Sequence, residues 1–145
     1  MDFSSKQQNE GKWCWFNGHD ASDGGLCLRV MSIDESRRIS KIVTKSKHKP
    51  IKGQVVKIDE VDEELKDRLT WDYCITAWKD VKLDGKLLEC NADNKVKMMK
   101  HNLFAAFFID RMAELNDELE TTRELQEKNS KTSSSGSAPQ IVETA

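Results

Sequence analysis

Two short stretches near the start of the chain have the two-residue period of a β-strand. Trp13 and Trp15 alternate with Cys14 and Phe16, and over residues 26–31 leucine and valine recur at every second position. Between the two stretches lie an Asn-Gly pair at 17–18 and a Gly-Gly pair at 24–25, both typical of turns. The pattern predicts an antiparallel hairpin that begins a small sheet.

A short helix and a further strand are predicted next. Either Ser32 or Asp34 can cap a helix that runs through residues 39–43, because a side-chain oxygen accepts hydrogen bonds from the first free amides of a helix. We interpret residues 45–50 as a polar, basic connection. Residues 54–58 are rich in β-branched side chains, which favours another short strand.

A longer helix is predicted over residues 61–78. It begins with acidic residues, which the N-terminus of a helix favours, and one apolar face recurs at steps of four: Leu65, Leu69, Tyr73 and Ala77. Around Ile75 the pattern also permits an extended stretch. Residues 79–90 are predicted as a hairpin with the pair Asp84-Gly85 in its tight turn. Asn91 is a favourable N-cap for the helix that follows.

The last predicted element is one long amphipathic helix over residues 92–127. Over residues 103–109 it is apolar almost all round, and beyond Met112 its apolar side narrows to a stripe on an acidic helix. A narrow stripe of this kind can pack against a partner helix. The Ser/Thr-rich residues 129–145 are predicted to form a disordered tail, and residues 1–11 a flexible N-terminus.

Together these elements predict an α+β fold in a single domain over residues 12–128. A small N-terminal antiparallel sheet, belonging to a strand-rich part over residues 12–58, packs with helices, and the long amphipathic helix and the tail follow. A chain of 145 residues is long enough to bury a core of this size without a metal or disulfides.

Composition mainly excludes classes of protein. The net charge is −2, from 23 basic and 25 acidic residues, so no strong field of one sign attracts nucleic acid or anionic lipid. No apolar run approaches the ~20 residues that a membrane span needs. No apolar signal-peptide core follows Met1, so we expect a cytoplasmic protein whose four cysteines are reduced.

The charges are nevertheless unevenly distributed. Residues 37–57 hold eight basic residues and no acid, whereas residues 59–67 hold six acids. We interpret both stretches as solvated faces, and internal pairing between them is the alternative.

The sequence offers weak candidates for chemistry. Cys14, His19 and Cys27 lie close together, but the chain lacks the tight C-x₂₋₄-C pair typical of zinc sites, and cysteines in apolar strands usually act as small hydrophobic residues. No nucleophile signature and no phosphate-binding glycine motif are present. We therefore expect no enzyme, no catalytic residue, no bound metal and no cofactor.

Aromatic residues beside the basic stretch raise nucleic-acid binding as a further possibility. Trp13 and Trp15 precede the basic residues 37–57, and single-strand binders combine aromatic and basic side chains. The near-neutral total charge argues against it, and tryptophans in the core of a small sheet are the favoured interpretation.

Three segments in the middle of the chain resemble a known family. They are DYCITAWKDV at residues 72–81, LDGKLL at residues 83–88 and NADNK at residues 91–95. Together they resemble the tail assembly chaperones of long-tailed, siphovirus-type bacteriophages, with Trp78, Asp84, Gly85 and Asn91 as the matching scaffold positions. The resemblance covers roughly residues 60–131. One departure is Ala77, where the family frequently has glycine.

This resemblance implies a helper of tail assembly. Such proteins coat the tape measure protein in the host cell cytoplasm and are displaced when the tail tube protein polymerises around it, so they are absent from the mature virion. The resemblance also implies that a frameshift-extended form can exist and leaves self-association open.

The dense apolar part of the long helix is the candidate partner-binding surface. We assign to it Leu103, Phe104, Phe107, Phe108, Met112 and Leu115. The alternative is that these side chains are simply core. Two other classes remain open for the whole protein: a virion component, such as a head–tail connector or tail completion protein, and a zinc or nucleic-acid-binding module.

Overall fold

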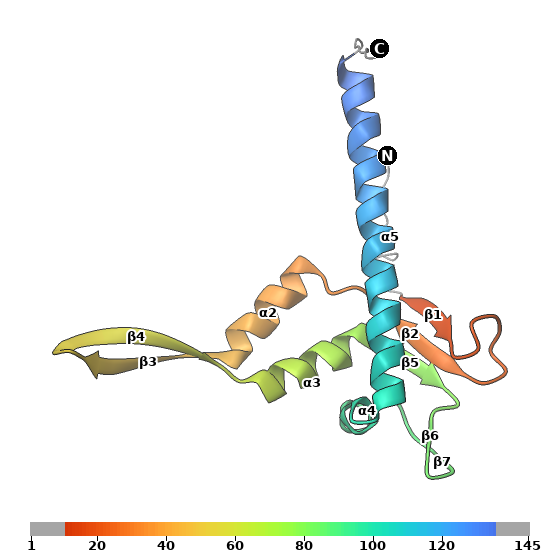
Figure 1. Cartoon of the computed structure of the whole chain (residues 1–145), viewed down its shortest axis with the longest axis horizontal. Helices are drawn as coiled ribbons and strands as arrows, with labels where there is room; N and C mark the ends of the chain where they lie inside the picture. The colour runs from red at the N-terminus through yellow and green to blue at the C-terminus, as the bar shows by residue number, and fades with distance from the viewer. Residues whose placement is uncertain (1–10, 136–145) are drawn as a thin grey trace. The chain divides into compact units, whose positions relative to one another are not determined.

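The computed structural model describes residues 11–135, with side chains described as far as residue 128. Helices and small antiparallel sheets make up these residues (Figure 1), which confirms the predicted α+β fold with its long C-terminal helix. The predicted flexible residues 1–10 and the tail residues 136–145 lie outside the described part.

The central sheet has three strands in the order β1-β2-β5, all antiparallel: β1 (Lys12–Trp15), β2 (Gly25–Leu28) and β5 (Ile75–Lys79). The predicted N-terminal hairpin is confirmed, with Cys14 opposite Leu26. Gly25 permits the close pairing, because a Cβ there would lie 2.5 Å from the Cys14 carbonyl oxygen.

The third strand corrects the helix predicted over residues 61–78. Helix α3 (Glu63–Cys74) is shorter, and the chain enters β5 at Ile75. β-branched Ile75 is completely buried and pairs with Leu28, so burial against β2 outweighs the helical spacing of the preceding residues.

Helix α2 (Ile33–Val43) begins at the predicted cap Ser32, whose Oγ accepts a hydrogen bond from the amide of Glu35 at 3.1 Å. Its buried residues are Ile39 and Val43, four apart on one face. Helix α3 begins in the same way at Asp62 and packs against α2.

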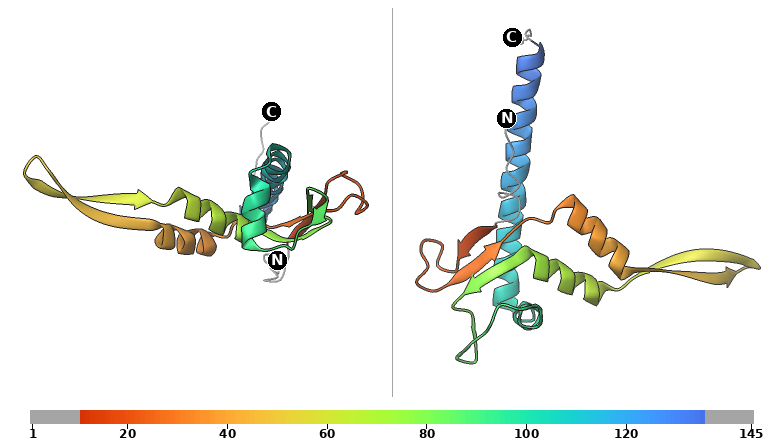
Figure 2. Two further views of the ribbon diagram at one scale, coloured as in Figure 1. Left: turned by 90° about the horizontal axis from the view of Figure 1, so that it is seen from below. Right: turned by 180° about the vertical axis from the view of Figure 1, so that it is seen from behind.

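A two-stranded arm connects α2 to α3. It consists of β3 (Thr44–Ile51) and β4 (Gln54–Val61), and Figure 2 shows it extending beyond the adjoining ends of these helices. The prediction of an irregular connection at residues 45–50 is therefore wrong. The tight turn at Lys52 and Gly53, both at positive φ, allows the two strands to pair. Pro50 is tolerated because both strands of a two-stranded ribbon are edges.

The second predicted hairpin is present as β6 (Lys82–Leu83) and β7 (Lys86–Leu87). Asp84 and Gly85 form its turn with φ values of 51° and 80°, as an Asp-Gly turn of this class requires.

The helix predicted as continuous over residues 92–127 is divided into α4 (Ala92–Met99) and α5 (Asn102–Ser135). Asn91 caps α4 as predicted. At the other end, the amides of Lys100 and His101 donate to carbonyls three residues back, Lys97 and Met98, which tightens the last turn and ends the helix. α5 continues to Ser135, so residues 129–135 are helical and not disordered as predicted.

The chain divides into two compact units after Met112, within α5. The first unit contains the fully buried side chains Leu26, Leu28, Val43 and Ile75. In the second unit most described side chains are exposed, because beyond Met112 the helix has only a narrow apolar stripe. The single domain over residues 12–128 stays a prediction.

Candidate partner-binding groove at the start of α5

An open groove of about 500 Å³ lies within the first unit. It is formed by the first turns of α5, the end of α4, the segment from β5 through the β6–β7 turn, and one residue that follows β1. Its apolar lining residues are Phe16, Val81, Leu83, Met98, Leu103, Phe104 and Phe107.

Aromatic contacts fix the inner wall of the groove. The rings of Phe16 and Phe107 lie 4.9 Å apart, and the edge of Trp78 meets Phe104 with 6.1 Å between the ring centroids. Phe104 is buried, at 7% exposed, whereas Phe107 is only partly covered. Aromatic pairs in such geometries are stabilising beyond the area they bury, so this wall is preformed.

Leu103 stands on the rim of the groove with 89% of its surface exposed. A leucine side chain gains about 1.5–3 kcal/mol on full burial, and here that gain is not realised within the chain. The polar residues around it are Asp80, Lys82, Asp84 and His101. An apolar centre with a charged rim is the usual composition of a protein-binding site.

The family-like scaffold residues hold the loops that border the groove. Trp78 donates from Nε1 to the Leu88 carbonyl at 2.9 Å, and the Leu88 amide donates to the Val81 carbonyl at 2.9 Å. The Asn91 side-chain oxygen accepts a hydrogen bond from the amide of Asn94 at 2.9 Å and so caps the start of α4.

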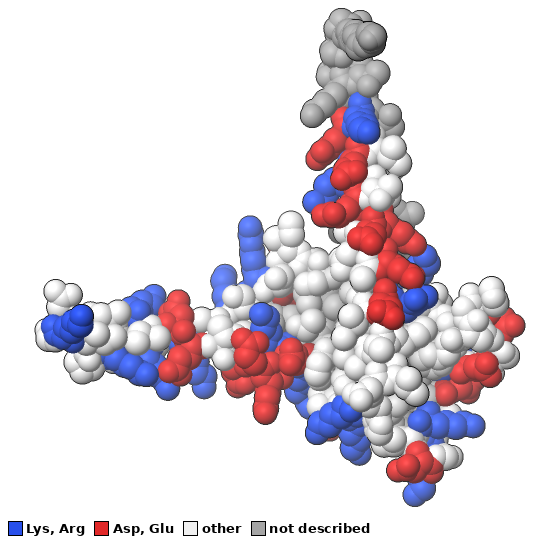
Figure 3. All heavy atoms as spheres, in the orientation of Figure 1, with Lys and Arg blue, Asp and Glu red and all other residues white. Residues whose placement is uncertain are grey.

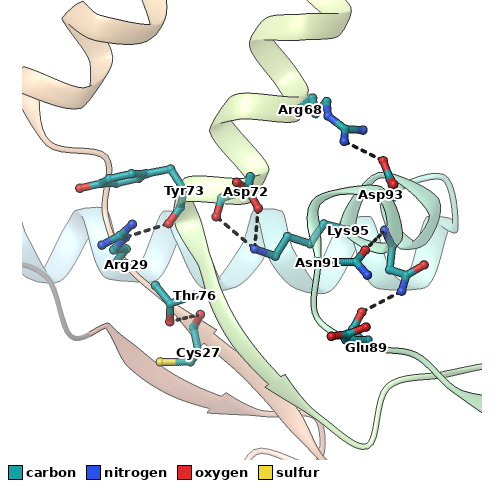
Figure 4. A network of polar contacts seen from close by, with 11 residues as sticks. Cys27, Arg29, Arg68, Asp72, Tyr73, Thr76, Glu89, Asn91, Asp93 and Lys95 are labelled. Atoms are coloured by element: carbon teal, nitrogen blue, oxygen red, sulfur yellow. Dashed lines mark hydrogen bonds and ion pairs between the residues drawn. The ribbon is translucent and has the colours of Figure 1, made fainter.

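A polar network ties α3 to α4 (Figure 4). Lys95 is a buried residue, and its ammonium group donates to a carboxylate oxygen of Asp72 at 2.9 Å and to the Asp72 carbonyl at 3.1 Å. Near the surface, Arg68 pairs with Asp93 at 2.6 Å. This network was not predicted from the sequence. The one feature that could have indicated it is the position of Lys95 on the same helical face as the apolar residues Met98 and Met99.

A second part of the network anchors β2 to the end of α3. Arg29 donates from Nε to the Tyr73 carbonyl at 2.8 Å, and its guanidinium lies 3.8 Å from the centre of the Tyr73 ring. Thr76 donates to the Cys27 carbonyl at 3.2 Å. These contacts fix the sheet against the helix from which β5 emerges.

The structure distributes the six predicted surface residues among different environments. Leu103, Phe104 and Phe107 line the groove, and only Leu103 is fully exposed. Phe108 is 7% exposed, and with Phe104 it belongs to the core, as the alternative interpretation held. Met112 and Leu115 are partly exposed, and Leu115 lies in the second unit.

Four apolar groove residues were not in the predicted set: Phe16, Val81, Leu83 and Met98. Met98 lies in the helix predicted over residues 92–127, but Phe16, Val81 and Leu83 come from other parts of the chain, so spacing along that helix could not identify them. For Phe16 the available signal was a large aromatic residue directly before the Asn-Gly turn.

The cysteines do not form a reactive or metal-binding cluster in the described residues. None of the four forms a disulfide within the described residues, and no three His, Cys, Asp or Glu side chains there are placed to hold a metal ion. Burial raises the pKa of the Cys74 thiol to about 11 and also raises the pKa of Cys90. Since the thiolate is the reactive form, burial disfavours nucleophilic chemistry at these two positions.

No family model, curated protein or solved structure matches this chain. Among the helices of residues 11–135, none combines the length and the apolar character needed to cross a membrane.

Proposed function

We propose that the chain is a non-enzymatic tail assembly chaperone of a long-tailed phage, and that it binds the tape measure protein in the groove at the start of α5. The observation that carries the proposal is this open apolar groove with Leu103 exposed on its rim. The resemblance of residues 72–95 to tail assembly chaperones supplies the biological setting.

The groove suits an amphipathic helix as client. Helix-in-groove recognition places apolar anchors from one helical face into a hydrophobic surface. Phe107 and Leu103 provide that surface, while Met98 adds a side chain that adapts easily to different partners. Because Trp78 and Phe104 already fix the inner wall, little ordering cost accompanies binding there.

In this role the protein covers apolar helices of the tape measure protein in the host cytoplasm until the tail tube protein displaces it. A rim that carries both charge signs, with Lys82 beside Asp80 and Asp84, favours a defined orientation of the client and keeps the complex soluble.

The test is a binding titration between the purified chain and the tape measure protein encoded by the same phage. Leu103→Asp places a charge on the rim at a highly exposed position, so the fold is retained while affinity falls at least about tenfold. The matched control is Ile33→Asp, which introduces the same charge at a residue that is 70% exposed in the first turn of α2 and does not line the groove.

Two results would contradict the proposal. One is a folded wild-type chain that does not bind the tape measure protein, and the other is an equal loss of affinity in Leu103→Asp and Ile33→Asp. Mass spectrometry of purified virions tests the remaining structural alternative, because a chaperone is absent from mature particles whereas a connector or tail completion protein is present.

A further inference from the structure

The β3–β4 arm concentrates positive charge on an exposed ribbon. Between Thr44 and Ile58 it carries five lysines and no acid, and within this stretch only the two end residues are even partly covered. Figure 3 shows the basic side chains along the arm. Lys45, Lys47 and Lys49 alternate along β3 and therefore share one face of the ribbon.

Two acids at the base of the arm, Asp59 and Glu60 in β4, neutralise part of this charge. Glu60 pairs with Lys47 at 2.9 Å and with Lys49 at 3.7 Å. Within residues 11–135 no ion pair is found for Lys45, Lys52 or Lys57. Lysines on edge strands also discourage strand-to-strand aggregation, so their presence alone does not identify a partner.

The same chain contains a surface complementary to the arm in charge and length. Exposed acids recur along one side of α5 at Asp117, Glu120, Glu124 and Glu127. At 1.5 Å per residue this row is about 15 Å long. The basic row from Lys45 to Lys49 spans about 13 Å at ~3.3 Å per residue.

We propose that the arm of one copy docks on the acidic side of α5 of a second copy. Two arms cannot dock on each other, because both are basic and repel. A nucleic acid has the charge to attract the arm, but the six acids over residues 59–67, next to the base of the arm, repel a polyanion. A second copy offers the opposite charge in a row of matching length.

Such a contact joins two different surfaces, so every copy can give an arm and receive one. Heterologous contacts of this kind build rings or open rows of subunits. Exposed ion pairs are individually weak and sensitive to salt, so the assembly forms at high protein concentration and low salt. The inference goes beyond the proposed client binding and does not depend on the groove.

The experiment is sedimentation velocity of the full chain over a range of concentrations, at about 20 mM and about 500 mM salt. We expect the mean mass of the wild type to rise with concentration at low salt and to stay monomeric at high salt. The arm variant Lys45→Glu/Lys49→Glu and the helix variant Glu120→Lys/Glu127→Lys each remain monomeric, with association at least about tenfold weaker. An equal mixture of the two variants associates again, because each supplies the complement of the other.

The matched control is Lys66→Glu/Lys86→Glu, which changes the net charge as much as the arm variant but at exposed residues outside the arm. We expect this control to associate like the wild type. Leu103→Asp should also associate like the wild type, and this result distinguishes self-association from client binding.

Circular dichroism confirms that each variant is folded. A wild type that stays monomeric at low salt overturns the proposal, as does a mixture of folded variants that fails to associate. Salt-sensitive binding of a DNA duplex, lost in the arm variant, overturns it in favour of nucleic acid.

Discussion

At the scale of single residues, the most unusual side chain is the buried lysine that joins α4 to α3, Lys95. The side chain of Lys95 is 7% exposed, whereas the side chain of its partner Asp72 is 49% exposed. The two ends of this ion pair are therefore not equivalent. Removing the Asp72 carboxylate leaves the Lys95 ammonium buried without its counter-ion. Removing Lys95 leaves the Asp72 carboxylate, which water can solvate.

We expect Asp72→Ala to lower the free energy of unfolding by about 2–3 kcal/mol, because the Lys95 ammonium then keeps only the Asp72 carbonyl as acceptor. Lys95→Met preserves the packing volume and costs less than about 1 kcal/mol. Urea denaturation of both variants measures the difference. Equal losses would show that the pair is not asymmetric in energy.

A second residue-scale prediction concerns the Cys74 thiol. Burial raises its pKa from 9.0 to about 11, so the folded chain retains this proton at pH values where the unfolded chain has lost it. The associated stability is complete below pH 9 and falls as the pH rises toward 11, by up to about 2–3 kcal/mol. Denaturation between pH 8 and pH 11 should show a steeper fall for the wild type than for Cys74→Ala. Other groups also titrate in this range, so the comparison with Cys74→Ala isolates the contribution of this thiol. An equal pH dependence of the free energy of unfolding in both proteins would contradict the raised pKa of Cys74.

At the scale of secondary-structure elements, the cap at Asn91 links stability to the groove. Its side chain satisfies the amide of Asn94, and Asn94 in turn donates to the Glu89 carbonyl at 2.8 Å. Asn91→Ala removes this cap at the start of the helix that carries Met98. We expect a loss of about 1 kcal/mol in unfolding free energy, measured by urea denaturation. The control Asn91→Asp retains an acceptor at the cap, so it should stay close to the wild type.

The elements also show where sequence patterns suffice and where they do not. The β1–β2 hairpin, the Asp84-Gly85 turn and the caps at Ser32 and Asn91 are local, and the sequence predicted them. β3 has no apolar alternation because neither face of the arm enters the core, so strand periodicity had nothing to detect. β5 was assigned to a helix because the i+4 spacing continues to Ala77, and only pairing with β2 makes it a strand.

The candidate site was predictable only in part for the same reason. The apolar density of α5 identified Leu103, Phe104 and Phe107, but the opposite wall comes from residues distant in sequence, such as Phe16 and Val81. Apolar spacing on one helix cannot distinguish a side chain that faces the core from one on the rim. Phe108 and Leu103 therefore looked alike in the sequence, although their exposed fractions are 7% and 89%.

At the scale of the whole molecule, the division after Met112 separates the two surfaces. The fully buried core and the groove belong to the first unit, whereas the four acids proposed to receive an arm follow residue 112. A chain ending at Met112 should therefore keep a cooperative unfolding transition, because every fully buried side chain remains. It should bind the tape measure protein with affinity within about threefold of the full chain, and it should no longer associate at low salt. Titration and sedimentation on the same preparation measure both properties. Association that persists in this fragment would place the self-contact elsewhere, while loss of client binding in a folded fragment would extend the binding site into the second unit.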